Sequence, residues 1–253
     1  MNPWSKTADK IFAVFDKLLK PNSDFEYEGH FTSGPRIEVE RAVKAVHGML
    51  TRLAVFQRKV DPASKDYRFS LLLDGSGSMA DNSVRQRGGL GLAAVFVDVF
   101  ERLGLPYSLD AFHDSYIPLK GFRQSLKTVG QRNQFFNNLI LNHWGGGGTN
   151  LRGGIAGSLK RILAEQKTDR RDIEFLFVLT DGEETNFDGP EIRTLCSQAA
   201  KQGIIVVGIG IGEGMQTVRT HFPVHLTETN PERLPGLIME FIKEYAQSRV
   251  EED

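Results

Sequence analysis

Two short apolar runs in this chain end in an aspartate that is followed directly by glycine. Residues 70–74 lead into Gly-Ser76-Gly-Ser78, and residues 173–181 lead into Gly182. Runs of this length and composition predict buried strands rather than helices. The chain must therefore fold so that two buried strands each deliver a carboxylate at their ends, which favours a layered structure around a sheet.

The first of these runs is followed by side-chain oxygen atoms at every second position. Asp74, Ser76 and Ser78 supply them, with no thiol or imidazole among them. Such ligands suit a hard cation such as Mg²⁺ or Mn²⁺. The intervening glycines let the backbone turn tightly enough for the three side chains to converge. The alternative is a simple Ser/Gly turn after a strand, and these residues alone leave both interpretations open.

Apolar strands alternate with amphipathic helices over most of the chain. This order predicts an α/β fold, a doubly wound and mostly parallel sheet flanked by helices. Ligands of such sheets bind at the carboxyl ends of the strands, so Asp74 and Asp181 are expected at one edge. The expected strands are 70–74, 107–112, 116–119, 173–180, 204–210 and 224–226, and the expected helices are 84–103, 129–141, 151–163, 192–199 and one from about residue 231.

Composition and charge narrow the class of protein. The chain has 253 residues, of which 40% are hydrophobic and 25% charged, enough for one large core. Its net charge of −1 lacks the basic excess of nucleic-acid binders. Cys196 is the only cysteine, which excludes an internal disulfide and a thiolate zinc site. Neither a membrane-spanning run nor a signal peptide is evident, so we expect a cytoplasmic protein without nucleic-acid or membrane partners.

Residues 1–66 are expected to form an N-terminal helical extension. Apolar residues at helical spacing predict helices over 8–19 and 39–56, separated by a polar stretch rich in turn-forming residues. The polar face of the second helix is rich in arginine and lysine. This face is either solvated or a docking surface for a partner.

The candidate ligands resemble the metal-ion-dependent adhesion site (MIDAS) of von Willebrand factor A (vWA) domains. The residues that carry the resemblance are Asp74, Ser76 and Ser78 after the first strand, Thr149 after a glycine-rich loop, and Asp181 after a later strand. The resemblance implies that Ser76 and Ser78 bind the cation through their hydroxyls. Thr149, Asp74 and Asp181 would bind it directly or through water. Mg²⁺ is the expected cation, with Mn²⁺ or Ca²⁺ as alternatives.

The same resemblance implies a vWA domain with a Rossmann-like fold over residues 67–250. It further implies a protein-protein interaction module rather than an enzyme. A site built from these ligands leaves one octahedral position open, which an Asp or Glu of another protein can fill. The implied partner is therefore a protein that supplies an acidic residue to the metal.

Further segments resemble vWA proteins that work with AAA+ ATPases, such as MoxR-associated proteins, chelatase subunits and midasin. These segments are Phe31–Ile37, before a predicted helix, and Gly208–Gly212, followed by Asn230–Pro235. The resemblance implies an AAA+ ATPase as the partner. Because this chain carries no AAA+ module, a separate chain would have to supply it.

Two other functions remain open at this point. A metal-dependent hydrolase would use a cation-bound water at the same edge of the sheet and would need a general base. His113, Asp114 and His143 are the candidates for that base. The other possibility is a scaffold whose metal site is vestigial. Trp144, beside His143, is expected to anchor the glycine-rich loop to the core.

Overall fold

The protein divides into two compact units. They comprise Met1–Phe15 with Asp66–Asp253, and Asp16–Lys65. The computed structural model describes residues 3–19, 26–32, 36–37, 44, 56–60, 67–81, 83–182, 189–211, 215–228 and 230–248.

The larger unit is built on a six-stranded sheet with the order β6-β5-β4-β7-β8-β9. Neighbouring strands are parallel except for β5 and β6, which are antiparallel. This confirms the predicted α/β fold with a mostly parallel sheet. The strands are β4 (Tyr67–Asp74), β5 (Tyr107–Phe112), β6 (Tyr116–Lys120), β7 (Ile173–Thr180), β8 (Ile204–Ile211) and β9 (Val224–Glu228).

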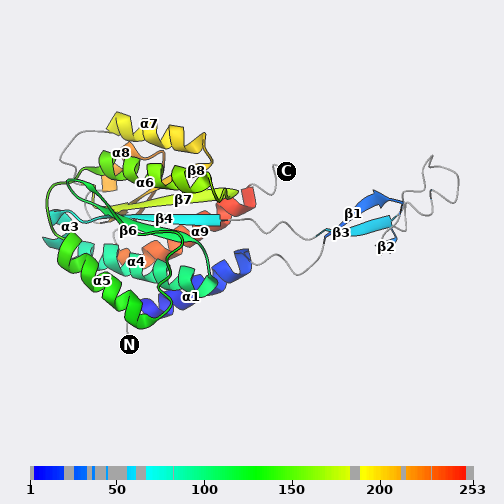
Figure 1. Ribbon diagram of the computed structural model, residues 1–253, viewed down its shortest axis with the longest axis horizontal. Coiled ribbons are helices and arrows are strands. Elements are labelled where there is room, and N and C mark those ends of the chain that lie inside the picture. Colours follow the sequence, from blue (N-terminus) through cyan, green and yellow to red (C-terminus); the bar gives the residue numbers. More distant parts are fainter. Residues whose placement is uncertain are drawn as a thin grey trace. The chain divides into compact units, whose positions relative to one another are not determined.

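Helices cover both faces of this sheet. Figure 1 shows α6, α7 and α8 on one side and α1, α4 and α9 on the other. None of the described helices has the length and apolarity needed to cross a membrane. The helices are α1 (Pro3–Leu19), α3 (Gly77–Asp81), α4 (Ser83–Leu103), α5 (Val129–His143), α6 (Leu151–Gln166), α7 (Gly189–Ala200), α8 (Met215–His221), α9 (Leu234–Ser248) and the 3-10 helix η2 (Pro231–Arg233).

The two central strands, β4 and β7, are buried along their whole length. Both read as continuous apolar runs because helices cover both faces of a parallel sheet. The chain passes from β4 to β5 on one side and later to β7 on the other. Strand order therefore reverses at β4, and the carboxyl end of β4 lies at the crevice where ligands of such sheets bind.

The first helix, as far as Phe15, belongs to the larger unit, although residues 1–66 were predicted to form an N-terminal helical extension. Ala8, Ile11 and Phe15 of α1 are buried. The Phe15 ring packs edge-on against Phe69, with 5.8 Å between the ring centroids, and against Phe100 at 6.3 Å. Burial of this apolar stripe against the aromatic core explains why α1 groups with the sheet.

The extension also contains strands, which is a second correction. Strands β1 (Glu26–Phe31), β2 (Arg36–Ile37) and β3 (Phe56–Val60) form an antiparallel sheet with the order β1-β3-β2. The sequence pattern does not reveal these strands, because strand formation depends on cross-strand partners that are distant in the chain. The helix predicted over 39–56 lies mostly outside the described residues, of which Lys44 is helical and Phe56 begins β3.

Candidate metal-binding site

Asp74 is the last residue of β4, and its carboxylate is fully buried. The Ser76 backbone N–H donates to Oδ1 over 3.0 Å, and the Thr180 hydroxyl donates to Oδ2 over 2.5 Å. Burial raises the pKa of Asp74 to about 6, although these hydrogen bonds favour the ionised form; the charge of Asp181 adds to the rise. Asp74 is thus a positioned carboxylate whose ionised form would gain from a nearby cation.

The two serine hydroxyls lie side by side. Ser76 Oγ and Ser78 Oγ are 3.1 Å apart, with Ser76 buried and Ser78 half-buried. The chain leaves β4 at Gly75 and enters the short helix α3 at Gly77, so both hydroxyls lie within one tight turn. The structure therefore brings Asp74, Ser76 and Ser78 together, as their spacing predicts.

The glycine-rich loop before α6 is hydrogen-bonded to the turn after β4. The backbone N–H groups of Gly145 and Gly146 donate to the Gly75 carbonyl over 2.8 and 3.3 Å. Gly145 has φ +82°, which favours glycine, and a Cβ at Gly75 would lie 2.4 Å from the His143 carbonyl oxygen. Glycine is needed at both positions for the two segments to approach this closely.

The same loop brings Thr149 to the carboxyl edge of the sheet. Thr149 is only 5% exposed and precedes Asn150, the N-cap of α6. The Asn150 N–H donates to the His113 carbonyl over 2.7 Å, while its side chain accepts from the Gly153 N–H over 2.9 Å. Backbone and cap together hold the start of α6, and with it Thr149, beside the end of β5.

Asp181 follows β7 directly and is also fully buried. Its neighbour Thr180 is the residue that donates to Asp74, so the ends of β4 and β7 are joined through side chains. Asp181 Oδ2 accepts from Arg85 Nη1 of α4 over 2.9 Å. Sequence reasoning missed both Thr180 and Arg85. A threonine just before a strand-end aspartate was a usable signal for Thr180, whereas Arg85 is 96 residues from Asp181.

The candidate general bases take part in holding the loops. Asp114 Oδ1 accepts from the Gly148 N–H over 2.7 Å, and the Asp114 carbonyl accepts from Asn150 Nδ2 over 3.2 Å. The Asp114 N–H in turn donates to His113 Nδ1 over 2.7 Å. A role in shaping the rim of the site accounts for these contacts.

The Trp144 side chain packs against α4. A Cβ added at Gly89 would lie 3.1 Å from the Trp144 ring, so the indole is in close contact with the helix there. This agrees with the predicted anchoring of the glycine-rich loop by Trp144.

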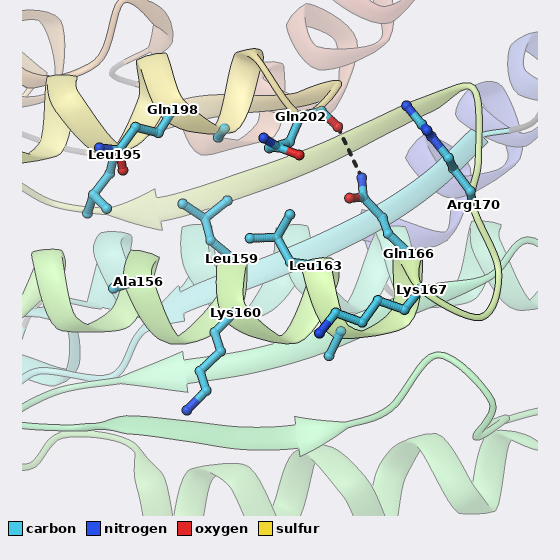
Figure 2. A pocket seen from close by; sticks show the side chains of 12 residues that line it. Ala156, Leu159, Lys160, Leu163, Gln166, Lys167, Arg170, Leu195, Gln198 and Gln202 are labelled. Atoms are coloured by element: carbon cyan, nitrogen blue, oxygen red, sulfur yellow. Dashed lines mark hydrogen bonds between the residues drawn. The ribbon is translucent and has the colours of Figure 1, made fainter.

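A groove with a volume of about 980 Å³ lies elsewhere, between α6 and α7. Figure 2 shows Leu159 and Leu163 pointing from α6 toward α7, and Gln166 Nε2 donating to the Gln202 carbonyl. That hydrogen bond is 3.2 Å long. The residues that line this groove include none of the five predicted metal ligands.

The donor set at the carboxyl edge is rich in hydroxyls and poor in carboxylates. Among the residues that the structure describes, no group of three or more His, Cys, Asp or Glu side chains is placed to hold a metal ion. A cation here would depend on Ser76, Ser78 and Thr149 in addition to Asp74 and Asp181. Carboxylate and hydroxyl oxygens fit a hard divalent cation that keeps some of its water.

Known protein structures share this fold. Proximal thread matrix protein 1 from the mussel byssus is 16% identical, with a TM-score of 0.54 over 70% of this chain and 47% of its own. Another structure of that protein, with a zinc-occupied MIDAS motif, is 17% identical, with a TM-score of 0.53 over 68% of this chain and 46% of its own. The pilus adhesin SpaC from Lactobacillus rhamnosus GG, in an open conformation, is 16% identical, with a TM-score of 0.54 over 74% of this chain and 30% of its own.

This chain thus spans less than half the length of each of these proteins, and at these identities the likeness concerns the fold. The sequence itself matches the family model of the von Willebrand factor type A domain over residues 70–222, which is more than half of the chain. That stretch begins in β4 and ends just after α8, so it contains the whole candidate site. The chain therefore belongs to the von Willebrand factor type A domain family.

Proposed function

We propose that this domain binds a divalent cation at the carboxyl edge of its sheet and, through it, an acidic residue of a partner protein. The single observation that carries the proposal is the meeting of two buried carboxylates, Asp74 and Asp181, with the paired hydroxyls of Ser76 and Ser78. Thr149 completes the proposed ligand set. Mg²⁺ is the proposed cation, with Mn²⁺ or Ca²⁺ as alternatives.

The residues present fit such a cation. Hard oxygen donors match Mg²⁺, which takes one or two carboxylates and keeps several waters. A bound metal would supply an open coordination position at the surface of the domain. The chain's own residues do the rest: Asp74 is oriented by Ser76 and Thr180, and Asp181 by Arg85.

We propose an AAA+ ATPase as the partner, in the cytoplasm. This finer proposal is supported by the resemblance of Phe31–Ile37, Gly208–Gly212 and Asn230–Pro235 to vWA proteins that work with such ATPases.

A binding role is favoured over hydrolysis. Asp114 is the acidic candidate for the general base, yet its carboxylate accepts the Gly148 N–H and thereby holds the glycine-rich loop. His113 Nδ1 accepts the Asp114 N–H, so this nitrogen is also engaged in the loop. A screen for phosphatase and esterase activity in Mg²⁺ or Mn²⁺ is expected to show no turnover.

The test is a metal titration of the full chain combined with partner binding. We expect the wild type to bind Mg²⁺ by calorimetry, and Asp74→Ala to lose that binding while remaining folded. Ser108→Ala is the control, because Ser108 Oγ donates to Ser70 Oγ within the sheet and away from the carboxyl edge. An AAA+ ATPase candidate should bind the wild type in Mg²⁺ but not in EDTA. Equal binding in both, or equal Mg²⁺ affinity of Asp74→Ala, would contradict the proposal.

A further inference from the structure

Arg85 places a buried positive charge beside the candidate metal site. Its Nη1 lies 2.9 Å from Asp181 Oδ2, and the two side chains are 11% and 0% exposed. Little water can screen a pair at this depth, so the interaction is much stronger than that of an exposed pair. Arg85 therefore acts on Asp181 both as a hydrogen-bond donor and as a counter-charge.

The carboxylate of Asp74 accepts hydrogen bonds from neutral groups rather than from a guanidinium. Asp74 accepts from the Ser76 N–H and the Thr180 hydroxyl, which are both neutral donors. When ionised, Asp74, Asp181 and Arg85 together carry one net negative charge. Addition of a divalent cation would leave one net positive charge, whereas without Arg85 the same cation would only neutralise the two carboxylates.

We propose that Arg85 is an internal counter-cation with two opposite effects on this site. It weakens binding of the metal, because it repels a second cation and holds one oxygen of Asp181. It also strengthens binding of an acidic ligand to the loaded site, because it makes that site more positive by one charge than it would be without Arg85. The inference rests on the proposed function and names the residue that tunes it.

A second buried arginine, Arg68 on β4, provides a control for Arg85 on α4. Arg68 Nη1 lies 3.0 Å from Glu174 Oε1, and both side chains are 1% exposed. Arg68 lies near the start of β4, six residues before Asp74, which is about 20 Å along an extended strand. Its charge is too distant to act on the metal site, yet its removal disturbs the fold in a comparable way.

The first measurement is the affinity for Mn²⁺, followed by electron paramagnetic resonance of the free ion. Arg85→Gln is expected to bind Mn²⁺ at least about tenfold more tightly than the wild type, since a nearby unit charge is removed. Arg85→Lys, which keeps the charge, and Arg68→Gln should both stay close to the wild type. Equal or weaker binding by Arg85→Gln would overturn the inference, as would tight binding by Arg85→Lys.

The second measurement uses acetate as a probe for the acidic ligand. Acetate binding to the Mn²⁺-loaded protein can be followed by water-proton relaxation. We expect Arg85→Gln to need several-fold more acetate than the wild type for half-saturation of the Mn²⁺-loaded protein. This loss of acetate affinity would be opposite in direction to the gain in metal affinity. An unchanged acetate requirement would overturn the second of the two proposed effects.

Thermal unfolding separates this role from a purely structural one. In EDTA, Arg85→Gln should melt below the wild type because Asp181 has lost its counter-charge, and saturating Mg²⁺ should raise its melting temperature by more than it raises that of the wild type. Arg68→Gln should be destabilised equally in both conditions. An Arg85→Gln protein that melts equally low in both conditions, or that folds in neither, would overturn the inference.

The outcomes also separate this inference from the proposed function. If the wild type binds no Mn²⁺ but Arg85→Gln does, the proposed function falls together with the effect on the acidic ligand, and only the weakening of metal binding by Arg85 is supported. If both bind Mn²⁺ equally, the inference falls and the metal site stands. If neither binds, both fall.

Discussion

Both ends of the central strands β4 and β7 hold buried carboxylates and guanidiniums, but the ratio of negative to positive side chains differs between the two ends. At the amino ends, the Arg68 guanidinium pairs with Glu174 and Asp169, and Asp169 pairs with Arg171, so two carboxylates meet two guanidiniums. At the carboxyl ends, Asp181 pairs with the Arg85 guanidinium, whereas Asp74 accepts from the neutral Thr180 hydroxyl. Among these side chains, the first group has as many guanidiniums as carboxylates, whereas Asp74, Asp181 and Arg85 together carry one net negative charge when ionised.

This difference separates a structural ion pair from a site that can bind. Buried carboxylates are tolerated when partners compensate their charge, and at the amino end Arg68 pairs with Glu174, although Glu174 Oε2 and Arg68 Nε find no hydrogen-bond partner among the described residues. At the carboxyl end, burial raises the pKa of Asp74 to about 6; burial also raises the pKa of Glu174 at the amino end, where the Arg68 charge opposes the rise. Two buried carboxylates near a pair of hydroxyls form an arrangement that a cation would stabilise.

The largest expected loss of stability concerns the amino ends of β4 and β7, where Arg68 pairs with Glu174. Arg68→Gln should lower the free energy of unfolding by about 3 to 5 kcal/mol, because it leaves Glu174 buried without its charge partner. Urea denaturation in EDTA and in Mg²⁺ should give the same loss. The double variant Arg68→Met with Glu174→Leu should be far less destabilised, because both charges are removed together. If Mg²⁺ restored the stability of Arg68→Gln, the amino ends of the strands would respond to the metal as the carboxyl ends are expected to, which would contradict the comparison.

A second test at the amino-end edge of the sheet measures how stability depends on pH. Lys120 ends β6, which runs antiparallel to β5, and its Nζ donates to the Tyr107 carbonyl over 2.8 Å near the amino end of β5. Burial lowers the pKa of Lys120 to about 8 from 10.5. Between these values the unfolded chain holds more protons than the folded protein, so the free energy of unfolding should rise with pH.

Lys120→Met should remove that rise. Relative to the variant, the wild type should gain about 2 to 3 kcal/mol between pH 7 and 10.5, measured by urea denaturation at each pH. Other titrating groups are common to both proteins and cancel in the difference. Parallel pH profiles of wild type and variant would show that Lys120 does not carry the effect.

At the carboxyl ends of β4 and β7, Thr180→Val removes the hydroxyl that donates to Asp74 Oδ2 while keeping the shape of the side chain. Loss of a hydrogen bond to a charged group costs about 1.5 to 3 kcal/mol. Because metal binding requires the ionised carboxylate, Mn²⁺ affinity should fall by roughly tenfold. Ser108→Ala, which loses a hydroxyl pair with Ser70, should lose about 1 kcal/mol of stability and no metal affinity. Undiminished Mn²⁺ binding by Thr180→Val would show that Thr180 does not prepare Asp74.

The smallest expected effect compares two glycines with positive φ. Gly147 has φ +71°, and a Cβ there would lie 2.1 Å from Asp114 Oδ2, which would displace the carboxylate that holds Gly148. Gly104 has φ +68° but no atom within 4 Å of an added Cβ. Gly104→Ala should cost about 1 kcal/mol from backbone strain alone.

Gly147→Ala should cost about 2 kcal/mol, because it adds the loss of a hydrogen bond to the strain. It should also weaken Mn²⁺ binding, because the same loop positions Thr149. Thermal unfolding and Mn²⁺ titration of the two variants give the comparison. Equal stability and equal Mn²⁺ affinity of the two variants would show that the contact with Asp114 does not position the loop.

Much of this architecture could be predicted from local patterns. The apolar runs of β4 and β7, the amphipathic helices between the strands and the carboxylates at the strand ends define the sheet and the edge where Asp74 and Asp181 lie. These features are readable because burial of one face or one run imposes a period on neighbouring residues. The small sheet β1-β3-β2 was not predicted, because its strands depend on pairing rather than on such a period.

The sequence by itself determined the family, the sheet and the oxygen ligands that one turn presents, because these depend on residues close together in the chain. Only the tertiary structure decided which charges these ligands meet. Arg85 reaches Asp181 across 96 residues and Thr180 reaches Asp74 across 106. It also decided that α1 packs with the aromatic core. Electrostatic balance and packing are set by distance in space, and a sequence pattern has no measure of that distance.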